Sequence, residues 1–314
     1  MTALSAESPP DNTRPQLATQ ITVAPDRLGL WLTLPAQLLL LFIVVFPILM
    51  QIYISMTDWS PLQGISWWNA WKSWNWFANF SDMLSDDRFW NAILRTLEII
   101  VVCVPAELLI GLGLALLFVG EFRGKRVAYS ILLMPMMVVP AVAGYMFYML
   151  FQSGGFVNAI ISRVVGRPIR AAWLSEDTLA MAAVMIADVW QWTPLMFLIL
   201  LSGLLSVPED QLRMASLLGA GPWQRFRTIT LPRIFGVLLI AVVIRVVELF
   251  KIFDTLYIMT RGGPGVSTET VSVYFFKLTI EDVNWSYVAS LALFILLILS
   301  VLGAFGIKRL SARR

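Results

Sequence analysis

Six long apolar blocks constrain this chain more than any other feature of its sequence. Each block is about 20 to 28 residues long, the length at which an α-helix crosses the roughly 30 Å hydrocarbon layer of a bilayer. Runs such as residues 30–56 offer no polar face to water, which argues against a large soluble protein. The sequence therefore predicts an all-α integral membrane protein with six transmembrane helices, at about 29–55, 92–119, 127–151, 178–204, 233–259 and 286–307.

Composition agrees with this class. Of 314 residues, 58% are hydrophobic and 14% are charged, whereas about a quarter of the residues in an average soluble domain are charged. Lys and Arg gather in alternate connections, chiefly 120–126 and 205–232. The positive-inside rule then predicts that the segment 205–232 and both ends of the chain are cytoplasmic, with a tail at 1–28, a transmembrane domain at 29–307 and a second tail at 308–314.

Several function classes lack the residues they need. The chain has no histidine and one cysteine, Cys103, so neither an intrachain disulfide nor a Cys/His metal site is expected. It has no P-loop motif and no nucleophile motif with a histidine base. The cations flank apolar blocks and form no basic stripe on a separate domain, so no nucleic-acid partner is expected. We therefore predict no catalytic residue, no metal and no cofactor.

The connection after the first block is rich in tryptophan. Indole rings favour the boundary between lipid headgroups and hydrocarbon, so we expect this connection to lie along the outer membrane surface. Stacking on a sugar is the alternative role. The tryptophans are Trp59, Trp67, Trp68, Trp71, Trp74, Trp76 and Trp90.

A polar segment of more than twenty residues separates the fourth and fifth blocks. Ser206 and Glu209 have the spacing of a capping box and predict a helix that runs to about Leu218. Gly219 follows, and glycine tolerates the left-handed conformation that ends many helices. Without a partner, such a helix would lie on the membrane surface as an amphipathic element.

A second short helix is expected after this glycine. Pro222 is suited to a first helical turn, and the helix is predicted over residues 223–228. Pro232 is expected to stop it before the fifth span begins.

The same segment resembles a known motif. Gly219, nine residues, Ile229, one residue and Leu231-Pro232 follow the G-x9-I-x-L-P pattern of the EAA loop in ATP-binding-cassette (ABC) importer permeases. Further stretches are similar to the maltose-type carbohydrate permeases of that family. They are Leu34-Pro-Ala, Phe46-Pro, Ser55-Met-Thr-Asp58, Phe89-Trp-Asn-Ala-Ile-Leu-Arg-Thr96, Trp190-Gln-Trp-Thr-Pro194 and the run from Phe253 to Thr270.

The resemblance implies a binding-protein-dependent carbohydrate importer of the bacterial inner membrane in which this chain forms half of the pore. A second homologous permease, two ABC ATPase subunits and an extracytoplasmic solute-binding protein would complete it. The polar segment would be the coupling helix that docks on an ATPase. The residues implied in coupling are Arg213, Ala215, Leu218, Gly219, Ala220, Phe226, Ile229, Leu231 and Pro232. The family's Glu-Ala-Ala falls at Arg213-Met-Ala215, so a base replaces the usual acid.

Charges inside the fifth block form the other candidate site. Arg245, Glu248, Lys251 and Asp254 follow i, i+3 spacing with alternating sign, which favours an ion-pair ladder, either within the helix or between two permeases. The alternative is a polar wall beside the solute path, and Arg95, Glu98, Glu107 and Asp188 pose the same choice. Aromatic and amide groups suited to a sugar, although also to packing, are Trp190, Gln191, Trp192, Phe250 and Tyr257.

A self-sufficient secondary transporter or channel is the alternative function. In that case the charges of the fifth block would relay an ion or a proton. The polar segment separates the two hypotheses, because a secondary transporter has no need of a helix that docks on an ATPase.

Overall fold

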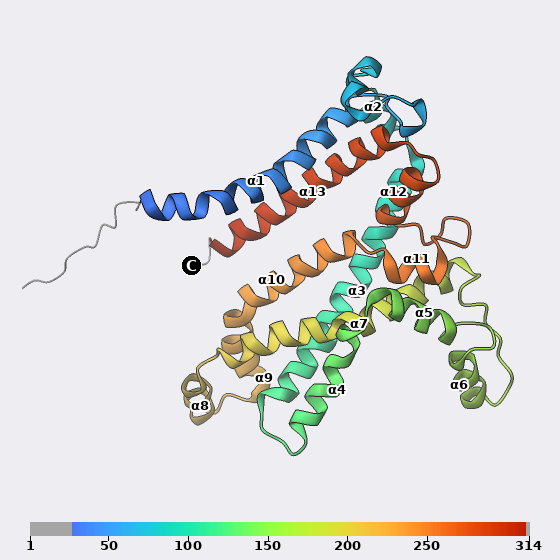
Figure 1. Ribbon diagram of the computed structural model, residues 1–314. Coiled ribbons are helices and arrows are strands. Elements are labelled where there is room, and N and C mark those ends of the chain that lie inside the picture. Colours follow the sequence, from blue (N-terminus) through green and yellow to red (C-terminus); the bar gives the residue numbers. More distant parts are fainter. Residues whose placement is uncertain (1–26, 312–314) are drawn as a thin grey trace, which may run out of the picture. The chain divides into compact units, whose positions relative to one another are not determined.

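A computed structural model describes residues 27–311, and in these residues the only β-structure is an isolated bridge between Thr57 and Trp74 (Figure 1). The remainder is helical or irregular. Most of the two tails expected at 1–28 and 308–314 lies outside the described residues. The chain divides into two units, residues 1–50 and residues 51–314.

The first unit contributes one described element, the start of helix α1 (Arg27–Ser55). The second unit contains the other helices that the structure describes. Its long helices are α3 (Asp87–Val119), α7 (Asp177–Leu205), α10 (Leu231–Phe250) and α13 (Trp285–Ser311). Its shorter ones are η1 (Pro61–Gln63), η2 (Trp67–Ser73), α2 (Ala78–Leu84), α4 (Lys125–Met137), α5 (Pro140–Leu150), α6 (Phe156–Val165), α8 (Glu209–Leu217), α9 (Pro222–Arg225), η3 (Phe226–Thr230), α11 (Asp254–Thr260) and α12 (Val271–Ile280).

Among residues 27–311, four helices are long and apolar enough to cross a membrane, within α1, α3, α7 and α13. Helices α4 and α5 could form a fifth span, but they are bent by 95° at their junction. The expected continuous helix at 127–151 is therefore wrong. Pro140 explains the bend, because a proline excludes the preceding residue from the helical region, and Val139 is extended.

The expected continuous helix at 233–259 is wrong as well. Helix α10 ends at Phe250, and α11 begins at Asp254 after a short irregular segment. The break leaves carbonyl groups without helical partners, and side chains near the start of α12 donate to two of them. The Ser272 hydroxyl donates to Phe250 O, and the Thr270 hydroxyl donates to Ile252 O.

Helices α3 and α7 approach closely at a glycine. A Cβ atom added at Gly111 would lie 2.9 Å from Met196 Cβ and 3.0 Å from Phe197 N. Small residues at such crossings let helix backbones meet in membrane proteins. Phe197 is fully buried beside Phe118, with 5.1 Å between the ring centroids. This crossing sets the positions of the charged groups on α3 and α7.

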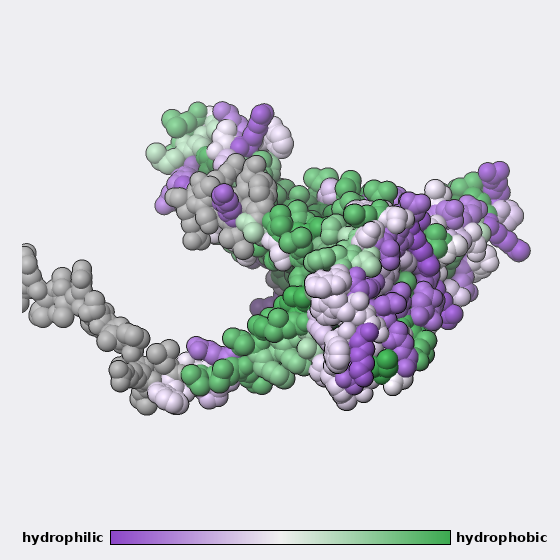
Figure 2. All heavy atoms as spheres, turned by 90° about the horizontal axis from the view of Figure 1, so that it is seen from above, coloured by the Kyte–Doolittle hydropathy of each residue, from purple (hydrophilic) through white to green (hydrophobic). Residues whose placement is uncertain are grey.

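The surface of the second unit is largely apolar. Leu109, Leu117 and Val101 of α3 are each about 70% exposed. Figure 2 shows apolar side chains over much of this unit and polar side chains gathered on its right-hand side. An apolar surface of this extent is suited to lipid or to other subunits rather than to water.

The tryptophans do not share one environment. Trp59 is buried, and its indole N–H donates to Ile65 O at 2.7 Å. Trp90 is half-buried against Phe294. These two are structural, whereas the tryptophans between them in the sequence are exposed: Trp67, Trp68, Trp71, Trp74 and Trp76.

Candidate functional site

The polar segment between α7 and α10 folds into the two short helices α8 and α9. The Ser206 hydroxyl donates to Gly203 O at the end of α7, and Pro208 is the residue before α8. The expected capping box is therefore wrong, because Ser206 completes the preceding helix instead. Gly219 has a φ of 84°, which confirms the left-handed conformation expected after α8.

The second part of this segment differs from expectation at Pro232. Helix α9 continues through the π-helical turn η3 into α10, and Pro232 lies in the first turn of α10. The Leu231 N–H donates to Phe226 O, five residues back. This wider turn accommodates a proline ring that would clash in a regular α-helix, so Pro232 does not end the helix.

Apolar side chains of this segment are strongly exposed. Met214, Leu217, Leu218 and Trp223 are 61% to 86% exposed. Arg213 is also exposed and pairs with Glu209 one turn earlier on α8. Ala215, Ala220, Phe226, Ile229 and Leu231 are half-buried. The surface of this segment thus combines exposed apolar side chains with an ion pair on α8.

Three helices meet at a buried ion triad. Arg245 of α10 donates from Nε and Nη2 to the two Glu107 oxygens, at 2.6 and 2.7 Å. Its Nη2 also donates to Asp188 Oδ2 of α7, at 2.8 Å. All three side chains are buried. An unpaired charge in lipid or in an apolar core is costly, and bidentate pairing of this kind offsets that cost.

The triad replaces the ladder expected along one helix. Arg245 pairs with α3 and α7 rather than with Glu248, and Asp254 belongs to a different helix. Only the pair of Lys251 and Glu248 matches the ladder, at 3.0 Å. The ladder fails because carboxylates of α3 and α7 occupy Arg245, and because α10 ends at Phe250, before Asp254.

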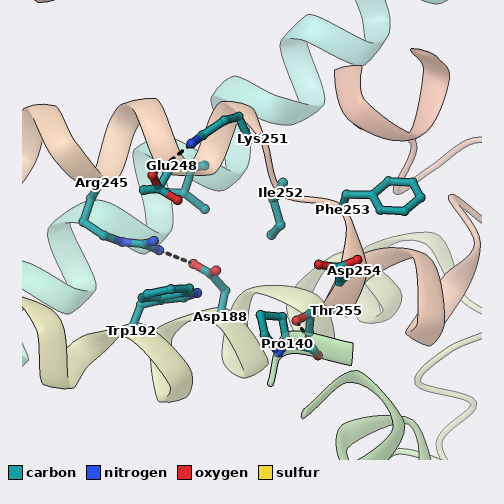
Figure 3. A pocket seen from close by; sticks show the side chains of 11 residues that line it. Pro140, Asp188, Trp192, Arg245, Glu248, Lys251, Ile252, Phe253, Asp254 and Thr255 are labelled. Atoms are coloured by element: carbon teal, nitrogen blue, oxygen red, sulfur yellow. Dashed lines mark hydrogen bonds and ion pairs between the residues drawn. The ribbon is translucent and has the colours of Figure 1, made fainter. Parts of the chain in front are cut away.

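A cavity of about 160 Å³ lies beside the triad, at the break between α10 and α11 (Figure 3). The Arg245 guanidinium lies over the Trp192 ring, 5.2 Å from its centroid. Irregular backbone and exposed charge at membrane depth are tolerated where they line water or face protein. The cavity is lined by Pro140, Asp188, Trp192, Arg245, Glu248, Leu249, Lys251, Ile252, Phe253, Asp254 and Thr255.

Five of the nine residues expected on a solute path meet here: Trp192, Arg245, Glu248, Lys251 and Asp254. The other four lie elsewhere. Trp190 packs on Phe147, Phe250 is buried, and Tyr257 stacks on Phe253. Gln191 is buried and donates to Val138 O at the bend before α5.

The sequence predicted neither the partners of Arg245 nor the role of Thr255. Glu107 and Asp188 were expected to pair or face the path, but no sequence pattern joined them to Arg245. Thr255 was missed; its hydroxyl donates to Pro140 O at 3.0 Å and ties α11 to α5. An acidic residue followed by threonine inside an apolar run is a helix-start signal, and Asp254-Thr255 has that form.

A second ion cluster, also missed, lies near the start of α3. Glu269 is fully buried and accepts from Arg88 at 2.8 Å and from Lys277 at 2.9 Å. Burial raises the pKa of Glu269, but these two cations outweigh it and hold the pKa below its usual 4.5. Through these pairs, the loop that joins α11 to α12 is attached to the start of α3.

Several long apolar helices and buried interior charges are typical of a polytopic membrane protein of the transporter class. Residues 87–314 match the family model described as binding-protein-dependent transport system inner membrane component. The chain therefore belongs to this family of permease subunits, which are transport components rather than enzymes.

Named relatives agree with this family. The chain is 34% identical over 267 residues to a probable ABC transporter permease of Sinorhizobium fredii, covering 82% of this chain and 84% of the relative. It is 30% identical to the trehalose/maltose transport system permease protein MalF of Thermococcus litoralis, covering 83% and 86%. It is 32% identical to the sulfoquinovosyl glycerol transport system permease protein SmoG of Agrobacterium fabrum, covering 85% of each chain.

The fold has a solved counterpart. A chain of a bacterial ABC transporter involved in the import of the acidic polysaccharide alginate superposes with a TM-score of 0.77. The match covers 91% of this chain and 96% of the other, at 16% sequence identity. At this low sequence identity, the comparison establishes a shared fold and nothing further.

Proposed function

We propose that this chain is a permease subunit of a carbohydrate importer and forms half of its translocation pore. The observation that carries the proposal is the cavity at the α10–α11 break, where charges that cannot face lipid surround an open space inside a permease fold. Relatives named for trehalose/maltose and for sulfoquinovosyl glycerol support carbohydrate as the solute class.

The architecture follows from the same proposal. Six spans result if α4 with α5 forms the third and α10 with α11 forms the fifth. Both ends of the chain and the segment 205–232 would then be cytoplasmic, in keeping with their Lys and Arg. The tails would be residues 1–28 and 308–314, on either side of a transmembrane domain at 29–307.

The segment 205–232 is proposed to couple the pore to ATP hydrolysis. Exposed Leu217, Leu218 and Trp223 offer an apolar face to a groove on an ATPase subunit. Gly219 would act as the hinge between α8 and α9. The contacting residues would be those implied by the resemblance, namely Arg213, Ala215, Leu218, Gly219, Ala220, Phe226, Ile229, Leu231 and Pro232.

Arg213 is the departure from the family pattern within this surface. Arg213 pairs with Glu209 within α8, so its charge is compensated before any ATPase subunit binds. We expect the ATPase groove to have adapted to the cation, and Arg213→Glu to weaken docking because it places two acids one turn apart.

The partners proposed are a second homologous permease, two ABC ATPase subunits and an extracytoplasmic solute-binding protein. Affinity purification of the tagged chain from its own cells tests this assembly. The expected result is co-purification of a P-loop ATPase and a second permease. Purification of the chain alone, under conditions that keep membrane complexes intact, would contradict the proposal.

A further inference from the structure

The cavity at the α10–α11 break has an unequal charge lining. Five charged side chains line it: Asp188, Glu248, Asp254, Arg245 and Lys251. Three are acids and two are bases, so the lining carries one net negative charge when all are ionised. The Glu107 carboxylate lies directly behind Arg245 and adds a second negative charge to the surroundings.

Each of the two cations is paired with at least one carboxylate. Arg245 gives three hydrogen bonds to Glu107 and Asp188, and its guanidinium lies against the Trp192 ring. Its side chain is 1% exposed. Lys251 is more open, but its Nζ lies 3.0 Å from Glu248 Oε1. An anion could reach Lys251, which uses one of its three N–H donors on Glu248, but the carboxylates of Glu248 and Asp254 together outweigh this one cation.

Acceptor oxygens, in contrast, are available. Asp254 is exposed and forms no ion pair or side-chain hydrogen bond with any other residue that the structure describes. Asp188 bonds Arg245 through Oδ2. Figure 3 shows Asp188 and Asp254 on opposite sides of the cavity, with Trp192 near Asp188. Carboxylates accept from hydroxyl groups and repel other anions.

We propose that this cavity selects neutral, polyhydroxylated solutes over anionic ones, and that Asp254 is the specificity-determining acceptor. This inference rests on the proposed carbohydrate path and adds the charge of the solute to it. Sugar hydroxyl groups donate to Asp254, whereas a phosphate, sulfonate or carboxylate group meets the net negative charge of the lining.

Binding to the purified complete complex, without solute-binding protein, tests the cavity directly. Saturation-transfer NMR would compare two matched pairs of probes: trehalose with trehalose 6-phosphate, and glucitol with glucitol 6-phosphate. We expect the neutral member of at least one pair to bind about tenfold more tightly, a factor that corresponds to about 1.4 kcal/mol. Equal or tighter binding of both phosphates would overturn the proposal.

Variants of Asp254 identify the residue responsible. Asp254→Lys supplies a free cation and should raise phosphate binding while lowering neutral binding. Asp254→Asn keeps a hydrogen-bond acceptor but removes the charge. It should preserve the affinity for the neutral probes and reduce the difference in affinity between neutral and phosphorylated probes. Asp58→Lys makes the same change of charge at an exposed position outside the cavity and should leave both affinities unchanged.

The remaining outcomes also decide. If Asp254→Lys leaves the preference intact, or shifts it no more than Asp58→Lys does, Asp254 is not the selecting group. If no probe binds while the ATPase still co-purifies, the cavity is not a solute site even though the chain remains a permease. The co-purification therefore separates failure of this inference from failure of the proposed function.

Discussion

At the scale of single residues, the interior charges fall into a buried group and an open group. Arg245 compensates two buried carboxylates, so Arg245→Ala leaves Glu107 and Asp188 facing each other without a cation. Removing one partner of a buried pair costs about 3–5 kcal/mol. We expect a loss of that size in the free energy of unfolding, measured by denaturant titration in detergent.

Lys251→Ala is the matched control for this change. Lys251 and Glu248 have side chains that are 61% and 42% exposed, and exposed pairs contribute less than about 1 kcal/mol. The variant should therefore unfold almost like the unmodified protein. Equal destabilisation by Arg245→Ala and Lys251→Ala would show that the triad does not hold α3, α7 and α10 together.

Glu269 predicts a dependence on acid. Its pKa is lower in the folded protein than the ordinary 4.5, so its pairing with Arg88 and Lys277 stabilises the fold above pH 4.5. That contribution is lost as the pH falls below 4.5 through the folded pKa. Glu269→Gln should lower stability at neutral pH and flatten its decline in acid.

The comparison requires unfolding measurements across this range of pH. Glu281→Gln, at an exposed carboxylate in the connection after α12, should keep the decline of the unmodified protein. An unchanged slope in Glu269→Gln would assign the acid sensitivity to other groups.

At the scale of elements, the turn between α8 and α9 has a conformation that favours glycine. Gly219→Val places a β-branched side chain at a φ of 84°, and the left-handed region costs about 1–2 kcal/mol for such residues. The spans should still insert, because hydropathy determines insertion. Pull-down of the ATPase subunits and solute uptake should both fall.

Gly221 supplies the control for this turn. Its φ is −66°, and an added Cβ meets nothing within 4 Å at either glycine. Gly221→Val should therefore change docking less than Gly219→Val. Full docking and full uptake by Gly219→Val would remove the hinge role from this turn.

The crossing of α3 and α7 predicts another contrast between two glycines. A Cβ at Gly111 would meet Met196 and the Phe197 backbone at 2.9 and 3.0 Å, whereas at Gly113 it would meet nothing within 4 Å. Gly111→Val should separate the helices and lower the yield and thermal stability of folded protein. Gly113→Val should retain both, and a similar loss in the two variants would argue against the crossing.

Hydropathy predicted the existence of these elements better than their continuity. The apolar blocks at 92–119 and 178–204 coincide with α3 and α7 because long apolar runs leave a helix no alternative in lipid. The break after Phe250 was not predicted, because no proline or glycine marks it. It depends on Ser272 and Thr270, whose hydroxyl groups come from a segment about twenty residues away.

The candidate cavity was predictable by residue type and not by pairing. Arg245, Glu248, Lys251 and Asp254 were identified because charge inside an apolar block is costly. Their partners were expected within the same helix or on a second permease, and only the first kind of pairing, by i, i+3 spacing, is visible in a sequence. The real partners of Arg245 lie 138 and 57 residues away, and only the packing of three helices brings them together.

At the scale of the whole molecule, the chain has the features of one part of a larger machine. It belongs to a family of permease subunits, and its described surface carries exposed apolar helices together with a polar segment suited to docking. ATP hydrolysis is expected on a separate subunit, because the chain contains no P-loop motif. In the proposed assembly, energy would reach the cavity through α7 and α10, which flank the segment proposed to couple the pore to the ATPase.

Transport by reconstituted vesicles tests this account most directly. The complete complex, with solute-loaded binding protein on the outer face, should accumulate solute only when ATP reaches the ATPase subunits, and an ion gradient alone should not drive uptake. Accumulation by the purified chain alone, driven by a proton or sodium gradient, would contradict the account and establish a self-sufficient secondary transporter.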